Sequence, residues 1–278
     1  MSSIPLSSAI ALNNVPLDEK FFQSDKTYRV YNPDEPVVFT HIPKCAGTSF
    51  IRVLRFWFKE QYCHLIQDES KDIKLPKVPV FDDDGKYVQD IKCIHGHFNH
   101  GRGYGLPYHY PELNQYITIM RDPFDIVVSM YFFFKGKSLR GEFFHRGEQV
   151  DVRDQFPSVE HYVRNYPDWL FDHLPQNISL TNYEEQIRKR FIYVGLFEDM
   201  QTSIDVLAAI FGKTTMDMPK KNVSQYDEPV PEKLRERFYQ DYPLLLKIYQ
   251  FVKNRYRDPI NDLNLDLQSL KRKPAQNN

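Results

Sequence analysis

The stretch THIPKCAGTSF, from Thr40 to Phe50, separates two apolar segments of the chain. Before it, residues 36–40 begin with a proline and are rich in β-branched and aromatic side chains, which predicts a short buried strand. After it, residues 48–59 carry apolar side chains at helical spacing, which predicts a helix. The polar stretch is therefore the loop that joins the end of a strand to the start of a helix.

This loop has the residue types of an anion-binding site. A loop at the carboxyl end of a strand exposes backbone N–H groups, and the following helix adds the positive end of its dipole. Gly47 allows close approach of the backbone to a ligand, and Thr48 and Ser49 add hydroxyl donors. An ordinary capped helix after a turn would account for these three residues, but it would not account for Lys44. Because the lysine precedes the glycine, the loop is not a Walker A loop, which argues against an ordinary ATPase or GTPase.

The rest of the chain alternates between predicted strands and helices. Strands are predicted at 36–40, 90–98, 115–123 and 190–198, and helices at 48–59, 123–135, after 198, at 231–238 and at 243–256. Residues 157–190 are predicted to be mainly helical, 62–90 irregular and 136–156 a loop. Such alternation is typical of a parallel sheet flanked by helices, so we expect one α/β, P-loop-like domain. We assign an N-terminal arm to 1–35, the domain to 36–258 and a C-terminal tail to 259–278.

Composition excludes several classes of protein. The chain has 278 residues, of which 41% are hydrophobic and 26% charged, so it can form a core and is not predicted to be disordered. Its net charge of -1 argues against a nucleic-acid binder that relies on bulk positive charge. The N-terminus has no basic segment followed by a long apolar run, so we expect neither a signal peptide nor a membrane span and predict a cytoplasmic protein.

The three cysteines are sparse and widely spaced, at Cys45, Cys63 and Cys93. No CxxC pair or His/Cys cluster has zinc-binding spacing, so no metal site is predicted. An odd, sparse count fits a reducing compartment. Although Cys45 lies inside the loop, we interpret it as a small packing residue rather than a nucleophile.

A second anion site is predicted in IMRDPFDIVVSMYFF. Arg121 lies at the carboxyl end of a predicted strand, at the same edge of the sheet as the first loop, and Ser129 follows two helical turns later. Arginine binds a phosphate in fork geometry, and serine adds a hydroxyl. The alternative is that Arg121 pairs with Asp122 or Asp125 and that Ser129 is an ordinary helical residue.

These motifs together resemble a known family. HIPKCAGTS is similar to the 5′-phosphosulfate loop of the sulfotransferases that use PAPS (3′-phosphoadenosine-5′-phosphosulfate), and IMRDPFDIVVSMYFFF is similar to their 3′-phosphate motif. IHGHF, FIYVGLFEDM and KKNVS resemble segments of the heparan sulfate 2-O-sulfotransferase (uronyl 2-sulfotransferase) branch, in the same order. The resemblance runs from about Val37 to Tyr256 and implies a PAPS-dependent carbohydrate sulfotransferase with the sulfotransferase fold.

The resemblance implies a role for each matching residue. The 5′-phosphosulfate would be held by Lys44, Cys45, Ala46, Gly47, Thr48 and Ser49, the 3′-phosphate by Arg121 and Ser129, and the closing loop would contain Lys220, Lys221, Asn222 and Ser224. The sequence departs from the family at Ile126, where a second arginine is frequent.

Sulfuryl transfer requires an in-line attack by an acceptor hydroxyl and neutralisation of charge on the leaving phosphate. Lys44 is our candidate for that neutralisation. Histidine has a pKa near 6.5, which suits a general base, and His95 and His97 would point to the same side of an extended segment. The resemblance implies that His97 is the base and that His95 supports it or binds the acceptor, whereas the residues alone leave core or turn histidines as the alternative. No metal is required.

The expected partner is a carbohydrate or another hydroxyl-bearing acceptor. Aromatic and cationic side chains that suit an anionic sugar chain are His100, Arg102, Tyr104, Tyr108, His109, Lys135, Lys137, Arg140 and Arg146. A solvated surface of mixed charge is the alternative, and the sequence leaves a homo-oligomer open. Two other functions stay open as well: a catalytically silent nucleotide-binding module, and a kinase-like phosphotransferase, for which Asp122 is the one carboxylate placed to hold Mg²⁺.

Overall fold

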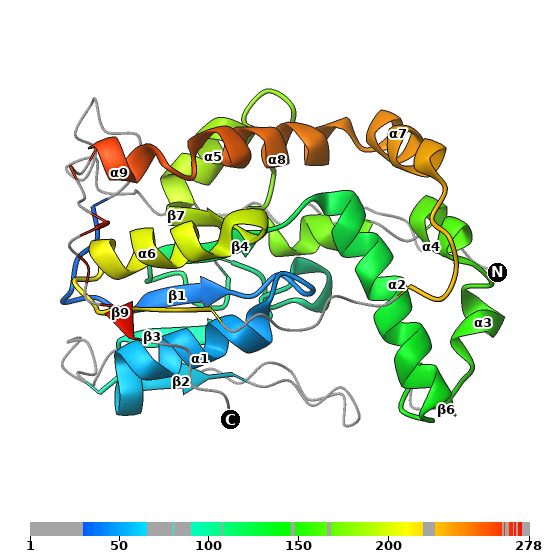
Figure 1. The fold of residues 1–278 in the computed structure, drawn as a ribbon, viewed down its shortest axis with the longest axis horizontal. Helices are drawn as coiled ribbons and strands as arrows, with labels where there is room; N and C mark the ends of the chain where they lie inside the picture. Colours follow the sequence, from blue (N-terminus) through cyan, green and yellow to red (C-terminus); the bar gives the residue numbers. More distant parts are fainter. Residues whose placement is uncertain are drawn as a thin grey trace.

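A five-stranded parallel sheet forms the centre of the protein, with the strand order β2-β3-β1-β4-β7 (Figure 1). The computed structural model describes residues 30–65, 80, 90–106, 108–145, 148–165, 168–218, 226–262, 264, 267–268, 270 and 272–273. The strands of the sheet are β1 (Val37–Thr40), β2 (Tyr62–His64), β3 (Cys93–Gly96), β4 (Tyr116–Met120) and β7 (Phe191–Leu196).

Helices flank this sheet, which confirms the predicted α/β fold. The α-helices of the described residues are α1 (Gly47–Phe58), α2 (Pro123–Leu139), α3 (Val152–Gln155), α4 (Val159–Asn165), α5 (Tyr183–Arg190), α6 (Met200–Ile210), α7 (Glu232–Asp241), α8 (Pro243–Arg255) and α9 (Asp258–Asp262). Short 3-10 helices occupy Lys59–Gln61, His100–Arg102, Asp168–His173 and Phe197–Asp199. Two minor sheets pair β5 (Phe144–His145) with β6 (Glu148–Gln149), and β8 (Thr215–Met216) with β9 (Arg272–Lys273).

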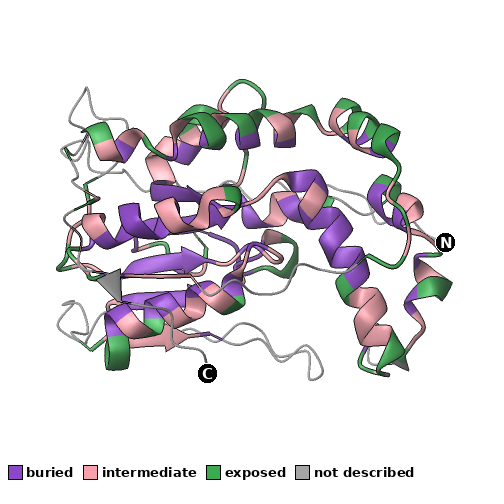
Figure 2. Cartoon of the chain, viewed as in Figure 1, coloured by how far each residue is buried: buried purple, intermediate pink, exposed green. Residues whose placement is uncertain are grey.

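The central strands are buried on both faces. Every residue of β1, β3, β4 and β7 is buried (Figure 2). Successive residues of a strand point to opposite faces of a sheet, so both faces are covered. Their β-branched and aromatic composition fits such a doubly covered parallel sheet. The strands expected at 36–40, 90–98, 115–123 and 190–198 are all present, although each is shorter than its predicted range.

Two segments differ from the prediction. The segment predicted as irregular, 62–90, begins with strand β2, which pairs with β3 in register Tyr62↔Cys93 to His64↔His95. The loop predicted at 136–156 is largely ordered: α2 continues to Leu139, and a short hairpin and α3 follow. Aromatic packing explains the order, because Phe134 contacts Phe143, Phe156 and Tyr162.

Residues of the expected N-terminal arm and C-terminal tail contact the domain. In the expected arm, the backbone N–H of Asn32 donates to the Gln115 side chain at 2.6 Å, and Lys92 donates to the Pro33 carbonyl at 3.1 Å. In the expected tail, β9 pairs with β8. Part of each terminal segment therefore packs on the domain.

The strand order creates a switch point at the carboxyl ends of β1 and β4. After β1 the chain runs through α1 to β2 on one side of the sheet, whereas after β4 it runs through α2 toward β7 on the other side. Ligands of open α/β sheets bind where neighbouring connections diverge in this way. The loops after β1, β3 and β4, which carry the predicted site residues, therefore meet at this edge.

Candidate active site

The loop between β1 and α1 has a backbone suited to anion binding. Lys44 and Ala46 have left-handed backbones, with φ of 65° and 58°, and Gly47 begins the right-handed helix α1. A left-handed residue followed by a right-handed one points successive N–H groups into one concavity that binds anions. Thr48 is exposed and Ser49 half-buried in the first turn of α1. The loop between β1 and α1, called the donor loop below, thus has backbone N–H groups, hydroxyls and a cation at one edge of the sheet.

Gly47 has a role that the sequence did not indicate. A Cβ built at this position would lie 1.7 Å from Nε2 and 1.9 Å from Cε1 of the His41 ring. Gly47 belongs to α1, and its φ is not in the left-handed region. Space for the His41 ring therefore requires glycine here, independently of any ligand that approaches the backbone.

The two predicted anion sites are in direct contact. Arg121 Nη1 donates to the Lys44 carbonyl at 3.2 Å, which confirms that both residues lie at one edge of the sheet. The Arg121 guanidinium lies 4.6 Å from the centroid of the Phe197 ring. Burial lowers the pKa of Lys44, and the positive charge of Arg121 lowers it further. Two neighbouring cations that form no ion pair with a described carboxylate favour an anionic ligand.

The carboxylates that could have neutralised Arg121 are paired with another arginine. Arg235 of α7 forms ion pairs with Asp122, at 2.8 Å, and with Asp125. Asp122 also caps α2 by accepting from the Asp125 N–H at 3.1 Å and from the Tyr239 hydroxyl at 2.8 Å. No ion pair within the described residues includes Arg121. The alternative of an Arg121–Asp122 or Arg121–Asp125 pair is therefore wrong.

The other two residues of interest on α2 are buried. Ser129 is 1% exposed, and its hydroxyl has no hydrogen-bond partner among the described residues. Ile126 is 2% exposed and belongs to the hydrophobic core. An unpaired buried hydroxyl costs about 1–3 kcal/mol, so Ser129 holds a polar group that a ligand oxygen could satisfy. Ile126 instead contributes to packing.

His97 is held in a defined protonation form. Its Nδ1 lies 2.9 Å from the carbonyl oxygen of His41. A carbonyl only accepts, so Nδ1 carries the proton, and the lone pair of the neutral ring is on Nε2. The His97 ring also stacks on the His41 ring, with centroids 4.0 Å apart. This arrangement fixes the ring and leaves Nε2 as its basic atom.

His95 is enclosed beside this pair. It is fully buried, its Nδ1 lies 2.6 Å from the Tyr62 hydroxyl, and its ring stacks parallel to His64 at 4.4 Å. Burial, together with the nearby His64, lowers the pKa of His95 to about 2, so it stays neutral at physiological pH. Both His95 and His97 lie next to the His41 ring, which agrees with the expectation that they point to the same side. Full burial leaves His95 no surface for contact with an acceptor.

Sequence reasoning missed His41 and His64 as members of this group. His41 was inside the quoted motif, but only its contacts reveal its part in the site. His64 lay in a segment predicted to be irregular. Although several rings gather here, no group of three His, Cys, Asp or Glu side chains in the described ranges could hold a metal ion. Stacked imidazoles direct their in-plane lone pairs away from a common point.

Cys45 agrees with the packing interpretation. It is 1% exposed and belongs to the core. Burial raises the pKa of its thiol to about 12, so the thiol stays protonated and is a poor nucleophile.

The residues expected to bind the acceptor differ in exposure and in pairing. Tyr104 is 4% exposed, and His100 donates from Nε2 to the Leu174 carbonyl at 2.9 Å, so both contribute to packing. Lys135 pairs with Asp227 and Glu228, and Arg140 with Glu142. Arg102 and Tyr108 are exposed. Arg146 and the predicted closing-loop residues Lys220, Lys221, Asn222 and Ser224 lie outside the described residues.

Lys137 differs from these cations. Its ammonium lies 5.1 Å from the centroid of the Phe133 ring, and the Lys44 ammonium lies 4.3 Å from the same centroid. Phe133 is 39% exposed. Within the described part of the chain no ion pair includes Lys137. An exposed aromatic ring between two cations thus extends the site along α2.

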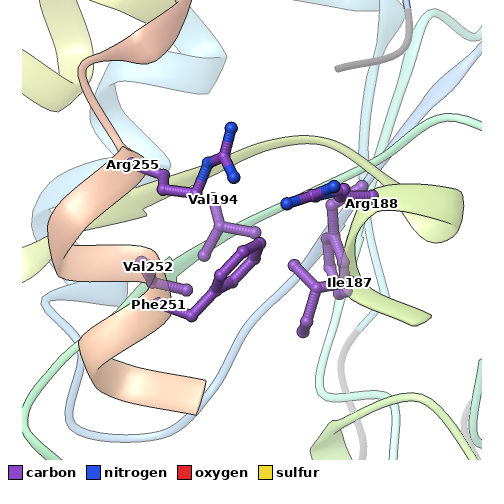
Figure 3. A pocket seen from close by; sticks show the side chains of 7 residues that line it. Ile187, Arg188, Val194, Phe251, Val252 and Arg255 are labelled. Atoms are coloured by element: carbon purple, nitrogen blue, oxygen red, sulfur yellow. The ribbon is translucent and has the colours of Figure 1, made fainter. Parts of the chain in front are cut away.

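A depression elsewhere on the molecule lies between α5 and α8 (Figure 3). Phe251 is at its centre, with the guanidinium groups of Arg188 and Arg255 5.4 and 5.5 Å from its ring centroid. It also includes Phe191, the first residue of β7, and therefore lies toward the amino ends of the strands. Its position separates it from the loops at the carboxyl ends.

Comparison with known proteins places the chain in a family. The chain belongs to the sulfotransferase family, whose model matches residues 28–252. A search of curated proteins found no match. A crystal structure of a sulfotransferase from Alicyclobacillus acidocaldarius is 17% identical over 81% of this chain and 97% of that chain, with a TM-score of 0.41. A mouse sulfotransferase, SULT7A1, complexed with PAP is 14% identical over 77% of this chain and 65% of that chain, with a TM-score of 0.39.

The family supports sulfuryl transfer in general, and hence a transferase that acts on a hydroxyl-bearing acceptor. Along the residues that the structure describes, no helix is both long and apolar enough to cross a membrane.

Proposed function

We propose that this protein transfers a sulfuryl group from PAPS to a hydroxyl of a carbohydrate acceptor. The observation that carries the proposal is the contact of the Arg121 guanidinium with the Lys44 carbonyl at the switch point of the sheet, where no ion pair among the described residues includes either cation. A donor with anionic groups at both ends of a nucleoside matches two such sites. The PAP complex of the mouse sulfotransferase makes this nucleotide the natural ligand to test.

The residues present suit a sulfuryl donor. The left-handed backbones at Lys44 and Ala46, and the hydroxyls of Thr48 and Ser49, provide donors for a 5′-phosphosulfate. Arg121 and the unpaired hydroxyl of Ser129 provide donors for a 3′-phosphate. PAPS, when bound, supplies an activated sulfuryl group. Lys220, Lys221, Asn222 and Ser224 complete the proposed binding set through the resemblance of the KKNVS segment.

The proposed reaction assigns separate roles to two residues. Lys44 neutralises the negative charge that develops on the leaving phosphate, because it stands in the donor loop and no ion pair among the described residues includes it. His97 accepts the acceptor's hydroxyl proton on Nε2, while its Nδ1–H stays bonded to the His41 carbonyl. His95 supports this arrangement as a neutral packing residue. No step requires a metal ion.

Lys137 is the proposed contact for an anionic acceptor. It shares the exposed Phe133 ring with Lys44, and a sugar can stack on such a ring while a carboxylate or sulfate meets the ammonium. Transfer from PAPS should therefore favour glycans with uronic acids over neutral glycans, with His97→Ala as the inactive control. Lys137→Met should reduce this preference and leave transfer to neutral glycans unchanged.

A kinase-like phosphotransferase is not favoured. Asp122, the one candidate for a magnesium ligand, is tied to Arg235, Tyr239 and the first turn of α2. Its Oδ1 atom makes all three contacts and so holds the start of α2 against α7.

Thermal unfolding in the presence of PAP (adenosine 3′,5′-bisphosphate) tests the proposal, and ATP plus Mg²⁺ is the ligand for comparison. At about 100 times its Kd, a ligand that binds only the folded state raises the free energy of unfolding by about 2.7 kcal/mol. We expect PAP alone to raise Tm, and Lys44→Ala and Arg121→Ala each to reduce that rise.

The control is Lys189→Ala, which removes one positive charge from α5, outside the donor loops, and should bind PAP like the wild type. If PAP leaves Tm of the wild type unchanged, the donor site is not of this kind and the proposal is wrong.

A further inference from the structure

His41 contacts both halves of the proposed reaction centre. It lies one residue after β1, and its backbone N–H donates to the Gly96 carbonyl at 2.9 Å, which extends the pairing of β1 with β3. Its carbonyl accepts from His97 Nδ1 at 2.9 Å, and its ring stacks on the His97 ring. The residue therefore holds His97 by two independent contacts.

The His41 ring also contacts the donor loop. The position that a Cβ of residue 47 would occupy is filled by the His41 ring, at 1.7 Å from Nε2. The first turn of α1 and the His41 ring are consequently in close contact, and neither can move toward the other. The ring is also surrounded by Phe39 and His95, with centroid distances of 5.9 and 5.2 Å.

One nitrogen of the ring makes no hydrogen bond to the described residues. Its Nδ1 atom is buried and has no partner. Burial lowers the pKa of His41 well below its usual value, and His97 adds to this effect. A neutral ring that is packed against Phe39, His95 and His97 acts through shape and packing rather than through proton transfer.

We propose that His41 is a positioning residue that sets the distance between the donor loop and the base His97, with the His41 ring as the spacer and Gly47 as the space that receives it. This inference rests on the proposed function and adds to it the residue that joins its two halves. The backbone carbonyl persists in every substitution at position 41, so side-chain variants isolate the contribution of the ring.

The test is a double-mutant cycle of Gly47→Ala and His41→Ala, with kcat, the KM for PAPS and Tm measured for each variant. Gly47→Ala should lower both Tm and kcat because the new methyl group displaces the ring. His41→Ala should lower kcat roughly tenfold while KM for PAPS changes less than about twofold, since the base loses its support and the donor loop keeps its own groups. The double variant should be more active than Gly47→Ala and about as active as His41→Ala, because the ring that clashes is gone.

A matched control is Gly136→Ala, a glycine inside α2 whose added Cβ would meet only Arg140 Nη1, at 3.6 Å. This variant should keep full activity and an equal or higher Tm. If His41→Ala does not fold, His41→Asn takes its place in the cycle, because its smaller amide leaves the ring's outer space empty.

Two results would overturn the inference: a double variant no more active than Gly47→Ala, or a kcat of His41→Ala equal to that of the wild type. The first would mean that glycine is needed for approach to the ligand, and the second that the ring does not position the base. If the wild type neither responds to PAP nor transfers sulfuryl groups, the proposed function itself is wrong. PAP binding and sulfuryl transfer by the wild type are therefore measured before the double-mutant cycle.

Discussion

The protonation form of His97 follows from a single hydrogen bond. A carbonyl partner for Nδ1 fixes the proton there and defines Nε2 as the basic nitrogen, with no carboxylate required beside the ring. The sequence HGHF cannot distinguish His95 from His97, because both flank the same glycine. The difference arises from depth: His95 is fully buried in β3, whereas His97 is half-buried in the loop that follows.

Ser129 allows ligand binding to be separated from stability. Its hydroxyl has no hydrogen-bond partner among the residues that the structure describes, so Ser129→Ala should leave the free energy of unfolding unchanged or raise it slightly. A hydrogen bond to a charged group contributes about 1.5–3 kcal/mol, so the same variant should weaken PAP binding roughly tenfold or more. Urea unfolding and calorimetric titration with PAP measure the two quantities.

Ser138→Ala is the matched control for this prediction, because the Ser138 hydroxyl accepts from the Val152 N–H at 3.0 Å. That variant should lose stability and keep its PAP affinity. Equal PAP affinity for Ser129→Ala and the wild type would remove Ser129 from the donor site.

The beginning of α2 is held by one carboxylate. Asp122 caps the helix and also meets Arg235 and Tyr239 of α7. Asp122→Ala removes the cap and leaves the Tyr239 hydroxyl without this acceptor, so we expect a loss of about 1–3 kcal/mol in the free energy of unfolding. Asp122→Asn keeps a capping oxygen and should lose less, because the ion pair with the partly exposed Arg235 contributes little. Urea unfolding of both variants measures these losses. Equal stability of Asp122→Ala and the wild type would show that the cap is dispensable.

The elements that the sequence predicted well are those with a strong local pattern. Strands β1, β4 and β7 are apolar runs with clear boundaries, and α2 begins at a proline after a capping aspartate. Strand β2 has only three residues, and its pairing with β3 depends on tertiary contacts that no local pattern records. The continuation of α2 through Gly136 had the same cause, because packing against α4 outweighs a cost of about 1 kcal/mol for glycine in a helix.

The site was predictable to a similar extent. The loop after β1 and the arginine after β4 could be placed at one edge because parallel strands end together. The link between Gly47 and His41 could not be predicted, because both residues fit an ordinary phosphate loop and only the three-dimensional packing brings the ring to the glycine.

The whole molecule should lose stability in mild acid because of its buried histidines. Burial lowers the pKa of His95 to about 2 and that of His173 to about 3, both below the value of about 6.5 expected in the unfolded chain. The unfolded state therefore binds more protons than the folded state below pH 6.5, so stability falls as the pH falls through that value. Each histidine should remove about 1.4 kcal/mol between pH 7.5 and 5.5.

Urea unfolding at these two pH values measures the effect, in a window above the titration of ordinary carboxylates. His173→Gln should show a smaller difference between the two pH values than the wild type, by about one histidine's share. A free energy of unfolding that stays constant from pH 7.5 to 5.5 would contradict the prediction.

The pairing of β4 with β7 also determines when the central sheet can be completed during synthesis. Strand β4 ends at Met120, but its neighbour β7 begins at Phe191, after α2, α3, α4 and α5 have been made. A nascent chain that has emerged only as far as α2 presents the β4 segment YITIM with one edge unpaired, and such an apolar edge is a template for association between chains. Partial translation products, rather than the finished protein, are therefore the species most dependent on chaperones, and the ribosome must release β7 before that dependence ends.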